Sequence, residues 1–397
     1  MLSKVDEVEL RKEAEEMLRC VILPFWHSMR DDRNGGFFGY IGSDLVRDES
    51  SDKGVILMSR ILWFFSETAM LLQSEKERNA AEHAYRFLSE RAIDREHGGV
   101  YWSLSYDGKP SDTSKHAYCQ AFAVYALSSY YRLTGDEKAL GEAFSIYSLL
   151  ESSCRDGIGY LENFHCDWTP DPDNSRLSGH GVNAYRTMNT LLHIFEAYSG
   201  LYQATGSQEV ASSMRRILGI YLDRVYSPEK RREEVFFDRN YVSLLDITSY
   251  GHDIESSWLI EWGASLLEDA ELSSRVSAAS SAMAWNVYEE AYDARGFIAN
   301  EKYGDNIDRS RIWWVEAEAV EGFLNEYRKS GNEKCKEAAV SIWRYIKEHF
   351  VDRRNGSEWF WAVGDGDEPV YSYPIADPWK CPYHNGRLCM NLMRGEL

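Results

Sequence analysis

Short segments that combine glycine with aromatic residues return along the chain at intervals of about sixty residues. A repeat with a regular period indicates a structure built from similar units that stack on one another. The sequence therefore predicts six related units. The six segments lie at residues 35–40, 98–102, 157–160, 235–238, 295–297 and 355–361.

The stretches between these segments have the periodicity of helices. In residues 117–133, for example, Phe122, Ala126 and Tyr130 fall on one stripe. Each interval has room for two helices, so units of helix, turn and helix form either an open solenoid or a closed (α/α)6 barrel. The chain has only nine prolines and no Ser/Gly-rich linker, which predicts one uninterrupted domain over residues 1–397.

The 397 residues carry a formal net charge of −20. An acidic protein repels polyanions, so neither nucleic acid nor an anionic membrane is an expected partner. No apolar run approaches the roughly 20 residues that span a bilayer, and the charged start of the chain is typical of an amphipathic helix. These features predict a cytoplasmic protein. The seven cysteines are odd in number and lack CxxC spacing, which favours reduced thiols.

Three histidines stand among aromatic and charged residues that suit acid–base chemistry near neutral pH. In the segment MNTLLHIFEAY, His193 shares a helical face with Asn189 and Glu196, while apolar residues form another face. A polar strip on a buried helix either bonds internally or faces a wet cavity. From this segment alone, a structural histidine is the favoured interpretation.

In the segment YGHDIESSW, His252 precedes a helix whose first turn carries Glu255. This spacing makes the two residues neighbours, so the carboxylate is expected to orient the imidazole ring. A carboxylate favours the imidazolium form and a helix N-terminus disfavours it, which leaves the sign of the pKa shift open. A capping cluster is the alternative interpretation.

In the segment DPWKCPYHNGR, Pro378 and Pro382 forbid a helix before His384, and a helical stretch that carries Arg387 begins after it. A loop histidine between aromatic residues and an arginine is less typical of a core. This segment by itself favours a functional histidine.

Other residues support a site for a ring-shaped ligand. Arg60 interrupts an apolar stretch, although a structural ion pair would also explain it. Trp313 and Trp314 project on opposite sides of a helix, so at most one of them is expected to line a site. Trp314 shares its face with Glu318.

Motifs for metal or nucleotide chemistry do not occur in the sequence. The histidines lack HxH, HxxxH and HExxH spacings, and the chain has no GxSxG elbow, Walker loop or GxGxxG turn. The sequence therefore predicts neither a metal site nor a cofactor. Two carboxylates arranged for glycoside hydrolysis remain an alternative, because acidic helical barrels rich in aromatic residues also serve as hydrolases.

Six segments in colinear order resemble the cellobiose 2-epimerases, a group within the N-acylglucosamine 2-epimerase superfamily. The segments are GGFFGY, KGVILMSRILWFFS, MNTLLHIFEAY, GHDIESSW, DRSRIWWVEAEA and KCPYHNGR, and the resemblance covers residues 10–393. It implies an all-α fold, an (α/α)6 barrel of six helical hairpins with short Gly/aromatic β-loops. It also implies an enzyme that inverts C2 of the reducing-end sugar in β-1,4-linked disaccharides without a cofactor.

The resemblance also implies roles for individual residues. His252 and His384 match the catalytic pair; we assign His252 as the base that removes the C2 proton and His384 as the acid that opens the ring and returns a proton. Arg60 and His193 match residues that stabilise the enediolate. The residues expected to bind the sugar are Tyr118, Asn189, Glu255, Trp314, Trp379 and Arg387.

Two positions depart from the pattern of the family. Gly181 stands where an acidic residue is usual, and Leu191 stands where a second histidine is usual. The substrate is therefore left open among cellobiose, mannobiose, lactose and a monosaccharide. Three alternatives to epimerisation also stay open: an aldose–ketose isomerase, a glycoside hydrolase and a helical-repeat binding protein. The expected partner is a small sugar, and the expected state is a monomer or weak dimer.

Overall fold

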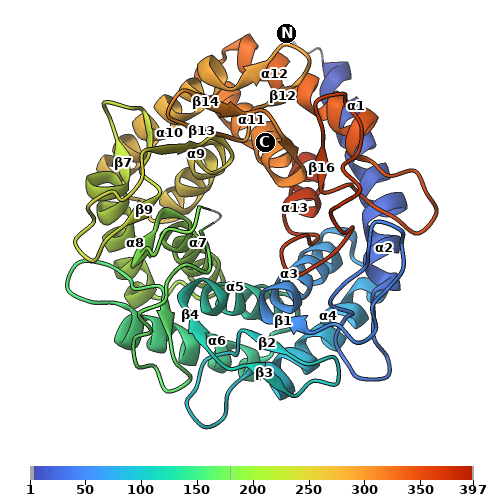
Figure 1. Cartoon of the computed structure of the whole chain (residues 1–397), viewed down its shortest axis with the longest axis vertical. Helices are drawn as coiled ribbons and strands as arrows, with labels where there is room; N and C mark the ends of the chain where they lie inside the picture. Colours follow the sequence, from blue (N-terminus) through green and yellow to red (C-terminus); the bar gives the residue numbers. More distant parts are fainter. Residues whose placement is uncertain (1–3, 179, 396–397) are drawn as a thin grey trace.

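The computed structural model describes residues 4–178 and 180–395 and arranges its helices in two concentric rings (Figure 1). Helices of the inner ring are buried almost throughout; in the first of them, every residue from Val55 to Ala69 is buried. The inner helices are α3 (Val55–Leu72), α5 (Ala117–Thr134), α7 (Met188–Thr205), α9 (Tyr250–Ser265), α11 (Trp313–Ser330) and α13 (His384–Arg394).

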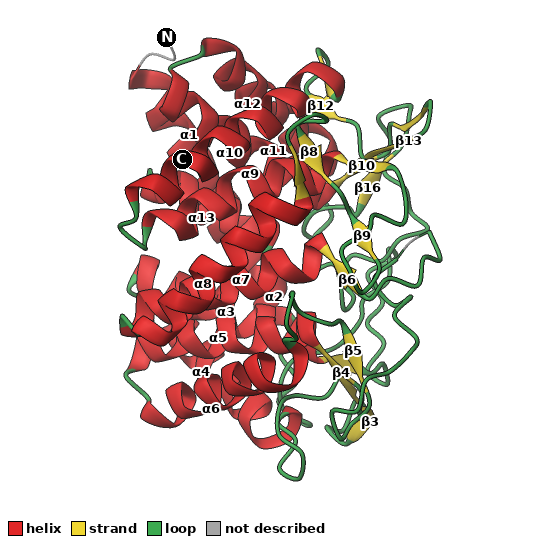
Figure 2. Cartoon of the chain, turned by 90° about the vertical axis from the view of Figure 1, so that its left-hand side faces the viewer, coloured by secondary structure: helices red, strands yellow, loops and turns green. Residues whose placement is uncertain are grey.

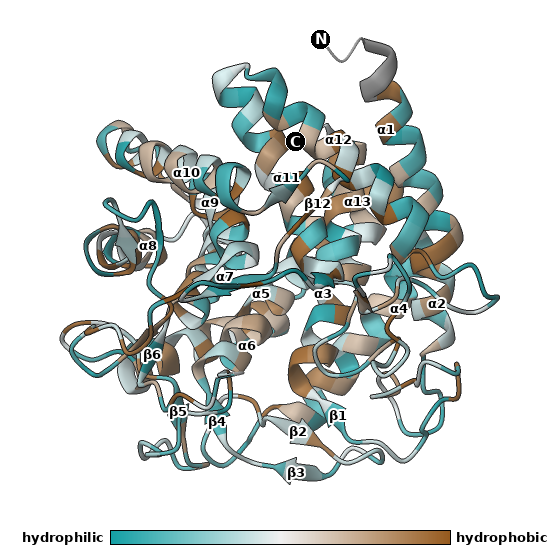
Figure 3. Cartoon of the chain, turned by 45° about the horizontal axis from the view of Figure 1, so that its top comes forward, coloured by the Kyte–Doolittle hydropathy of each residue, from teal (hydrophilic) through white to brown (hydrophobic). Residues whose placement is uncertain are grey.

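The outer helices are amphipathic and cover the inner ring. They are α1 (Lys4–Met17), α2 (Leu23–Ser28), α4 (Glu75–Phe87), α6 (Glu137–Leu149), α8 (Gln208–Ile220), α10 (Ala270–Glu290) and α12 (Glu333–Tyr345). Wider π-type turns extend several of them, at η1 (Leu18–Ile22), η2 (Leu88–Ala92), η3 (Leu150–Cys154), η4 (Tyr221–Val225) and η5 (Ile346–Phe350). Figure 3 shows hydrophilic residues along α1 and hydrophobic stretches in α3, as expected for an outer and an inner helix.

The ring is closed by the two ends of the chain. Each inner helix packs against the next, and α13 contacts both α11 and α3. The outer partner of α13 is α1, from the opposite end of the sequence. The expected (α/α)6 barrel is therefore confirmed, and the open solenoid is excluded because the last unit meets the first.

All the described strands are short and lie with the long loops at one end of the barrel (Figure 2). The pairings are antiparallel. One three-stranded sheet contains β1 (Lys53–Gly54), β2 (Ser103–Leu104) and β3 (Pro110–Asp112), and another contains β10 (Ile247–Ser249), β13 (Glu301–Tyr303) and β14 (Asn306–Asp308). The two-stranded pairs are β4 (Lys115–His116) with β5 (Asn163–Phe164), β6 (Arg186–Thr187) with β9 (Phe236–Phe237), β7 (Tyr226–Ser227) with β8 (Arg232–Glu233), β11 (Tyr292–Asp293) with β12 (Phe297–Ile298), and β15 (Arg311–Ile312) with β16 (Ala362–Val363).

A strand leads directly into each of five inner helices: β1 into α3, β4 into α5, β6 into α7, β10 into α9 and β15 into α11. These five inner helices therefore begin at the strand end and run away from it. As a result, the side chains of their first two turns converge on one mouth of the barrel.

Buried ion pairs connect the repeated glycine turns to these helix starts. Lys53, just before α3, donates to Asp31 at 2.7 Å, and Lys115, just before α5, donates to Asp94 at 2.8 Å. Each aspartate begins a turn whose glycines take left-handed φ values, +66° at Gly36 among them. The sequence repeat thus marks the turn that fixes the entry of each inner helix.

By length and composition alone, α3 could cross a membrane, but 83% of it is buried inside the protein. The expectation that no apolar stretch approaches a bilayer span is therefore wrong for this helix. Its charged residues Arg60 and Glu67 are buried too, so α3 serves here as a core helix.

Candidate active site

A cavity of about 470 Å³ lies at the strand end of the barrel. It brings together residues that are far apart in the sequence, among them all three predicted histidines, His193, His252 and His384. The other predicted residues that line it are Arg60, Tyr118, Asn189, Glu255, Trp314 and Trp379. Of the predicted site residues, only Arg387 is absent from this lining.

Equivalent positions on the inner helices explain how these residues meet. Tyr118, Asn189 and Trp314 are each the second residue of an inner helix. One turn deeper, the sixth residue of the inner helix is Arg60 in α3, His193 in α7, Glu255 in α9 and Glu318 in α11. Because the helices start at the same end, residues with the same helical number lie at a similar depth.

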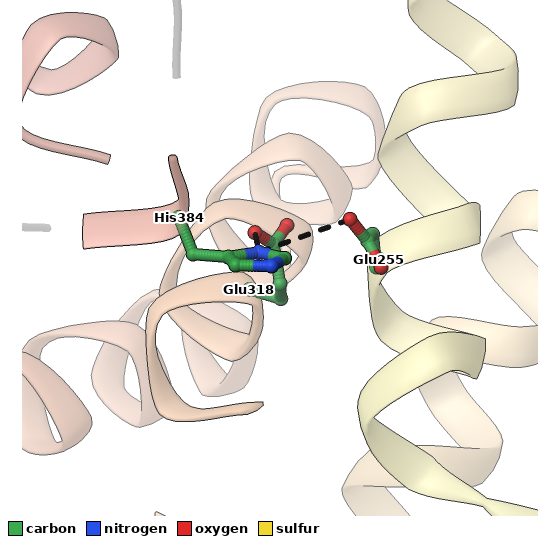
Figure 4. Close-up of side chains that lie close together, drawn as sticks. All are labelled: Glu255, Glu318 and His384. Carbon is green, nitrogen blue, oxygen red and sulfur yellow. Dashed lines mark hydrogen bonds and ion pairs between the residues drawn. The ribbon is translucent and has the colours of Figure 1, made fainter. Parts of the chain in front are cut away.

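His384 is the first residue of α13, and its ring is held by a carboxylate. Its Nδ1 donates to Oε1 of Glu318 at 2.6 Å, and Oε1 of Glu255 lies 3.9 Å from the same nitrogen (Figure 4). Burial lowers the pKa of His384 to about 3, even though Glu318 favours the imidazolium form. An ionised carboxylate only accepts, so the neutral ring keeps its proton on Nδ1 and leaves Nε2 as the basic nitrogen.

His252 has a different partner from the expected one. Its Nδ1 lies 2.8 Å from Oγ of Ser249, while Glu255 instead accepts from Arg387 at 3.1 Å. The expectation that Glu255 orients His252 is therefore wrong, because Glu255 bonds instead to the buried guanidinium of Arg387. Burial first, and then the neighbouring histidines His193 and His384, lower the pKa of His252 to about 3, so the ring is neutral at pH 7.

His193 both bonds internally and faces the cavity. Its Nδ1 donates to Oε2 of Glu196 at 2.8 Å, one helical turn away. The ring meets Tyr118 edge-on, with centroids 5.1 Å apart. Burial lowers its pKa as well. The polar strip of Asn189, His193 and Glu196 therefore contains an internal hydrogen bond, between His193 and Glu196, and also lines a cavity, through Asn189 and His193.

Arg60 has no carboxylate partner within the described residues, so an ion pair does not explain it. Its Nη2 donates to the hydroxyl of Tyr118 at 2.7 Å, and its guanidinium lies over the ring of Phe122 at 4.1 Å. Among the residues that the structure describes, Nε of Arg60 and Oδ1 of Asn189 are buried without a hydrogen-bond partner. Buried groups of this kind usually have partners, so these two are suited to bind a polar ligand.

Arg387 lies behind the cavity lining, and the expectation that it contacts substrate is not supported by its position. Its guanidinium donates to Glu196 at 2.8 Å and to Glu318 at 2.7 Å, in addition to Glu255. Glu196 holds His193 and Glu318 holds His384, so one buried arginine connects the supports of two histidines. Its position makes Arg387 a positioning residue.

The pKa values of two carboxyl groups around Arg387 are shifted in opposite directions. Burial and the nearby Glu318 raise the pKa of Glu255 well above its usual range. For Glu318, burial is outweighed by Arg387 and His384, and its pKa is lowered to about 2. Glu318 is therefore the anionic partner of the histidine.

Glu255, Glu318 and His384 are close enough to resemble a metal site, since their ligand atoms all lie within 4.8 Å of one another. The guanidinium of Arg387 bonds to both carboxylates. It already supplies the positive charge that a divalent cation would bring to this position. These three residues therefore do not fit a metal ion.

Sequence reasoning missed several lining residues. Trp313 and Trp314 both line the cavity, which corrects the expectation that at most one would. The ring of Trp313 packs against Trp361, with centroids 4.7 Å apart, and Trp361 also lines the cavity. Trp361 belongs to the last of the Gly/aromatic segments, so that repeat was the available signal. Arg176, from the loop before β6, is a further lining residue.

The two positions that depart from the family pattern lie in different surroundings. Leu191 is buried in the core, with 3% of its side chain exposed. Gly181 belongs to the same loop as Arg176, and open space surrounds the position that its side chain would take. The departure at Gly181 therefore lies in the loop beside the cavity. The departure at Leu191 lies in the core.

The closed barrel with an aromatic, histidine-lined mouth defines the class of protein as an (α/α)6-barrel enzyme that acts on carbohydrates. Within this class, the chain belongs to the N-acylglucosamine 2-epimerase family, whose sequence profile matches residues 16–384. It is thus a carbohydrate epimerase, and hence an isomerase.

Individual relatives agree with this assignment over nearly their whole length. A cellobiose 2-epimerase from Eubacterium cellulosolvens is 46% identical over 392 residues, which cover 95% of this chain and 96% of that protein. Another from Ruminococcus albus is 44% identical over 381 residues, covering 96% and 97%. The crystal structure of a sugar epimerase from a ruminal bacterium superposes with a TM-score of 0.95 at 44% identity, covering 97% and 99% of the two chains. The family expected from the motifs is confirmed.

Proposed function

We propose that this enzyme interconverts the C2 epimers of the reducing-end sugar in β-1,4-linked disaccharides, turning cellobiose into glucosyl-mannose without a cofactor. The observation that carries the proposal is the meeting of His252 and His384 on one tryptophan. The Trp314 ring lies 4.8 Å from that of His252 and 5.5 Å from that of His384, centroid to centroid. Two neutral imidazoles beside an aromatic platform suit proton transfer on a sugar that stacks there.

The reaction begins with opening of the sugar ring. Nε2 of His384 takes the proton from the O1 hydroxyl and delivers it to O5, so that the C1–O5 bond breaks and an aldehyde forms. A neutral ring can make both transfers, because it accepts the proton from O1 before it delivers it to O5. Glu318 stabilises the transient imidazolium.

The open-chain aldehyde makes the C2 proton acidic. His252 removes this proton to give an enediolate and later releases it to water. His384 takes a proton from water and returns it to the opposite face of C2, which inverts the configuration. Charge and protons balance over the cycle, and one solvent proton ends at C2.

The enediolate requires a fixed positive neighbour. Arg60 lacks a carboxylate partner in the described chain, so its charge is available to O1 and O2. His193 lies beside it and adds a second donor only as an imidazolium, because the neutral ring gives its one N–H to Glu196. In a dry site, one preorganised donor of this kind contributes roughly 3 to 4 kcal/mol to transition-state stabilisation.

The second sugar ring of a disaccharide has room next to the main cavity. A smaller cavity of about 220 Å³ shares Leu177, Asn189 and His252 with it. In our proposal, Trp314 and Trp379 stack on the sugar rings, and Oδ1 of Asn189 accepts from a hydroxyl. This extension supports a disaccharide over a monosaccharide.

The test is proton NMR of the product formed from cellobiose in deuterated water. We expect deuterium at C2 of an aldose with the mannose configuration. Label at C1 of a ketose would replace the proposal with an aldose–ketose isomerase, and release of glucose would replace it with a hydrolase. A panel of cellobiose, mannobiose, lactose, glucose, mannose and N-acetylglucosamine ranks the substrates. The variants His252→Ala and His384→Ala should each abolish the exchange.

A further inference from the structure

A second cavity, of about 520 Å³, lies at the other end of the inner helices. Its walls come from later turns of the helices that build the histidine cavity. Trp63 in α3, Tyr125 in α5 and Trp258 in α9 are each the ninth residue of an inner helix, and Trp262 and Asn325 are each the thirteenth. Eleven residues separate the second position from the thirteenth, which corresponds to roughly 16 Å along a helix. The second cavity therefore lies nearer the end of the barrel without strands, and Figure 2 shows that the strands gather at the opposite end.

The lining of this cavity is aromatic and polar, with balanced charge. Trp63 and Tyr125 stack at 5.6 Å between centroids, and two more tryptophans, Trp258 and Trp262, stand on α9. Three glutamates and three arginines also line it, so their formal charges cancel. Aromatic faces with amide and carboxylate groups recognise the C–H faces and hydroxyls of neutral sugars, whereas a polyanion would need a net positive charge.

Polar groups in this cavity remain available to a ligand. The amide nitrogen of Asn325 donates to Glu261 at 2.8 Å, and that of Asn391 donates to Glu321 at 3.4 Å. Within residues 4–178 and 180–395, the carboxamide oxygens of these two asparagines accept no hydrogen bond. They can accept from the hydroxyls of a bound sugar.

A single layer of side chains separates the two cavities. Trp258 lines the second cavity, and its Nε1 donates to Oε2 of Glu318 at 2.9 Å. The other oxygen of Glu318 accepts from His384 and from Arg387, which also lines the second cavity. The Arg387 guanidinium lies over the Trp258 ring at 4.6 Å. A ligand that moves either side chain acts on the carboxylate that orients His384.

We propose that this cavity is a second binding site for a neutral mono- or disaccharide and that its occupancy changes turnover through Trp258, Arg387 and Glu318. Sugar bound there does not react, since the three histidines face the other cavity. The two sites are coupled if sugar in the second cavity binds more tightly to one arrangement of the Glu318 carboxylate than to another. The coupling free energy equals that difference in binding free energy.

Trehalose is the probe, because a non-reducing disaccharide has no free aldehyde and cannot be epimerised. Isothermal titration calorimetry compares the wild-type enzyme with Trp262→Ala, which changes only the wall of the second cavity. The matched control is Trp379→Ala, which changes the wall of the histidine cavity. We expect Trp262→Ala to bind one trehalose fewer than the wild type and Trp379→Ala to keep the site that Trp262→Ala loses. If Trp262→Ala folds poorly, Trp262→Phe with Asn325→Ala serves in its place.

Kinetics test the coupling separately. A sugar that only competes at the histidine cavity raises KM and leaves kcat unchanged. We expect saturating trehalose to change kcat at least twofold in the wild type and to leave it unchanged in Trp262→Ala. No bound trehalose, or equal binding by wild type and Trp262→Ala, would overturn the site; an effect on KM alone would overturn the coupling. The calorimetric result does not depend on which reaction the histidines catalyse.

Discussion

Nδ1 of His384 and Oε1 of Glu318 lie 2.6 Å apart, although 66 positions separate the two residues in the sequence. Glu318 also accepts from Arg387 and from Trp258, so it is held in place from three directions. A carboxylate fixed in this way determines both the tautomer and the orientation of the imidazole. The basic nitrogen of His384 is therefore set by residues that do not touch the substrate.

Replacement of this carboxylate should reduce turnover strongly. We expect Glu318→Gln to lower kcat by about 10² to 10⁴-fold, because a neutral amide can reverse the tautomer and no longer stabilises the imidazolium. KM should change much less, since Glu318 is not in the cavity lining. Steady-state kinetics with cellobiose measure both constants. Glu321→Gln is the matched control, as Glu321 is a buried neighbour of Arg387 that bonds to Asn391 and to no histidine; an equal loss in both variants would contradict the role of Glu318.

Arg60 should act on the intermediate more than on the bound sugar. We expect Arg60→Lys to lower kcat by about 10² to 10³-fold with little change in KM, because lysine cannot keep both the bond to Tyr118 and a donor toward O1 and O2. The rate of C2 deuterium exchange should fall in parallel. Tyr118→Phe removes one partner of Arg60 and keeps the charge, so a smaller loss is expected there. A variant of Arg60 that changes only KM would assign this residue to ground-state binding.

The pH dependence should reflect histidines that stay neutral. The pKa values of His252 and His384 are both lowered to about 3, so the basic forms persist as the pH falls through the ordinary histidine value of 6.5. We expect kcat/KM to stay level from about pH 8 to about pH 5 and to fall only in more acidic solution, where the rings gain protons. An acid limb with an apparent pKa near 6.5 would show that the rings are not shielded as described.

The buried ion pairs at the strand end should be needed for stability. Lys115 and Asp94 are 0% and 3% exposed, so Lys115→Met leaves an uncompensated carboxylate in the core. We expect a loss of about 3 to 5 kcal/mol in the free energy of unfolding, measured by urea denaturation. Arg86→Met is the control, because its pair with Glu82 is more than half exposed, at 61% and 54%, and should contribute less than about 1 kcal/mol. Equal losses would mean that burial of the pair does not matter.

Local features of the sequence predicted much of the fold. The Gly/aromatic repeat required left-handed turns such as the one at Gly36, and helical periodicity between the turns gave two helices per unit. Both signals arise from neighbours in the chain, where backbone sterics and side-chain spacing act directly. Whether the units closed into a ring could not follow from periodicity alone, because closure depends on contact between α1 and α13 at opposite ends of the chain.

The sequence by itself determined the set of chemical groups: three histidines, Arg60, Glu255 and the tryptophans, in segments whose order identifies the family. Only the tertiary structure decided how they pair. It gave His252 to Ser249, moved Arg387 behind the cavity lining and set Glu318 beside His384. The physical reason is that hydrogen bonds and buried charges depend on distances between different helices. Those distances are fixed only when the ring closes and each buried carboxylate has to find a partner away from water.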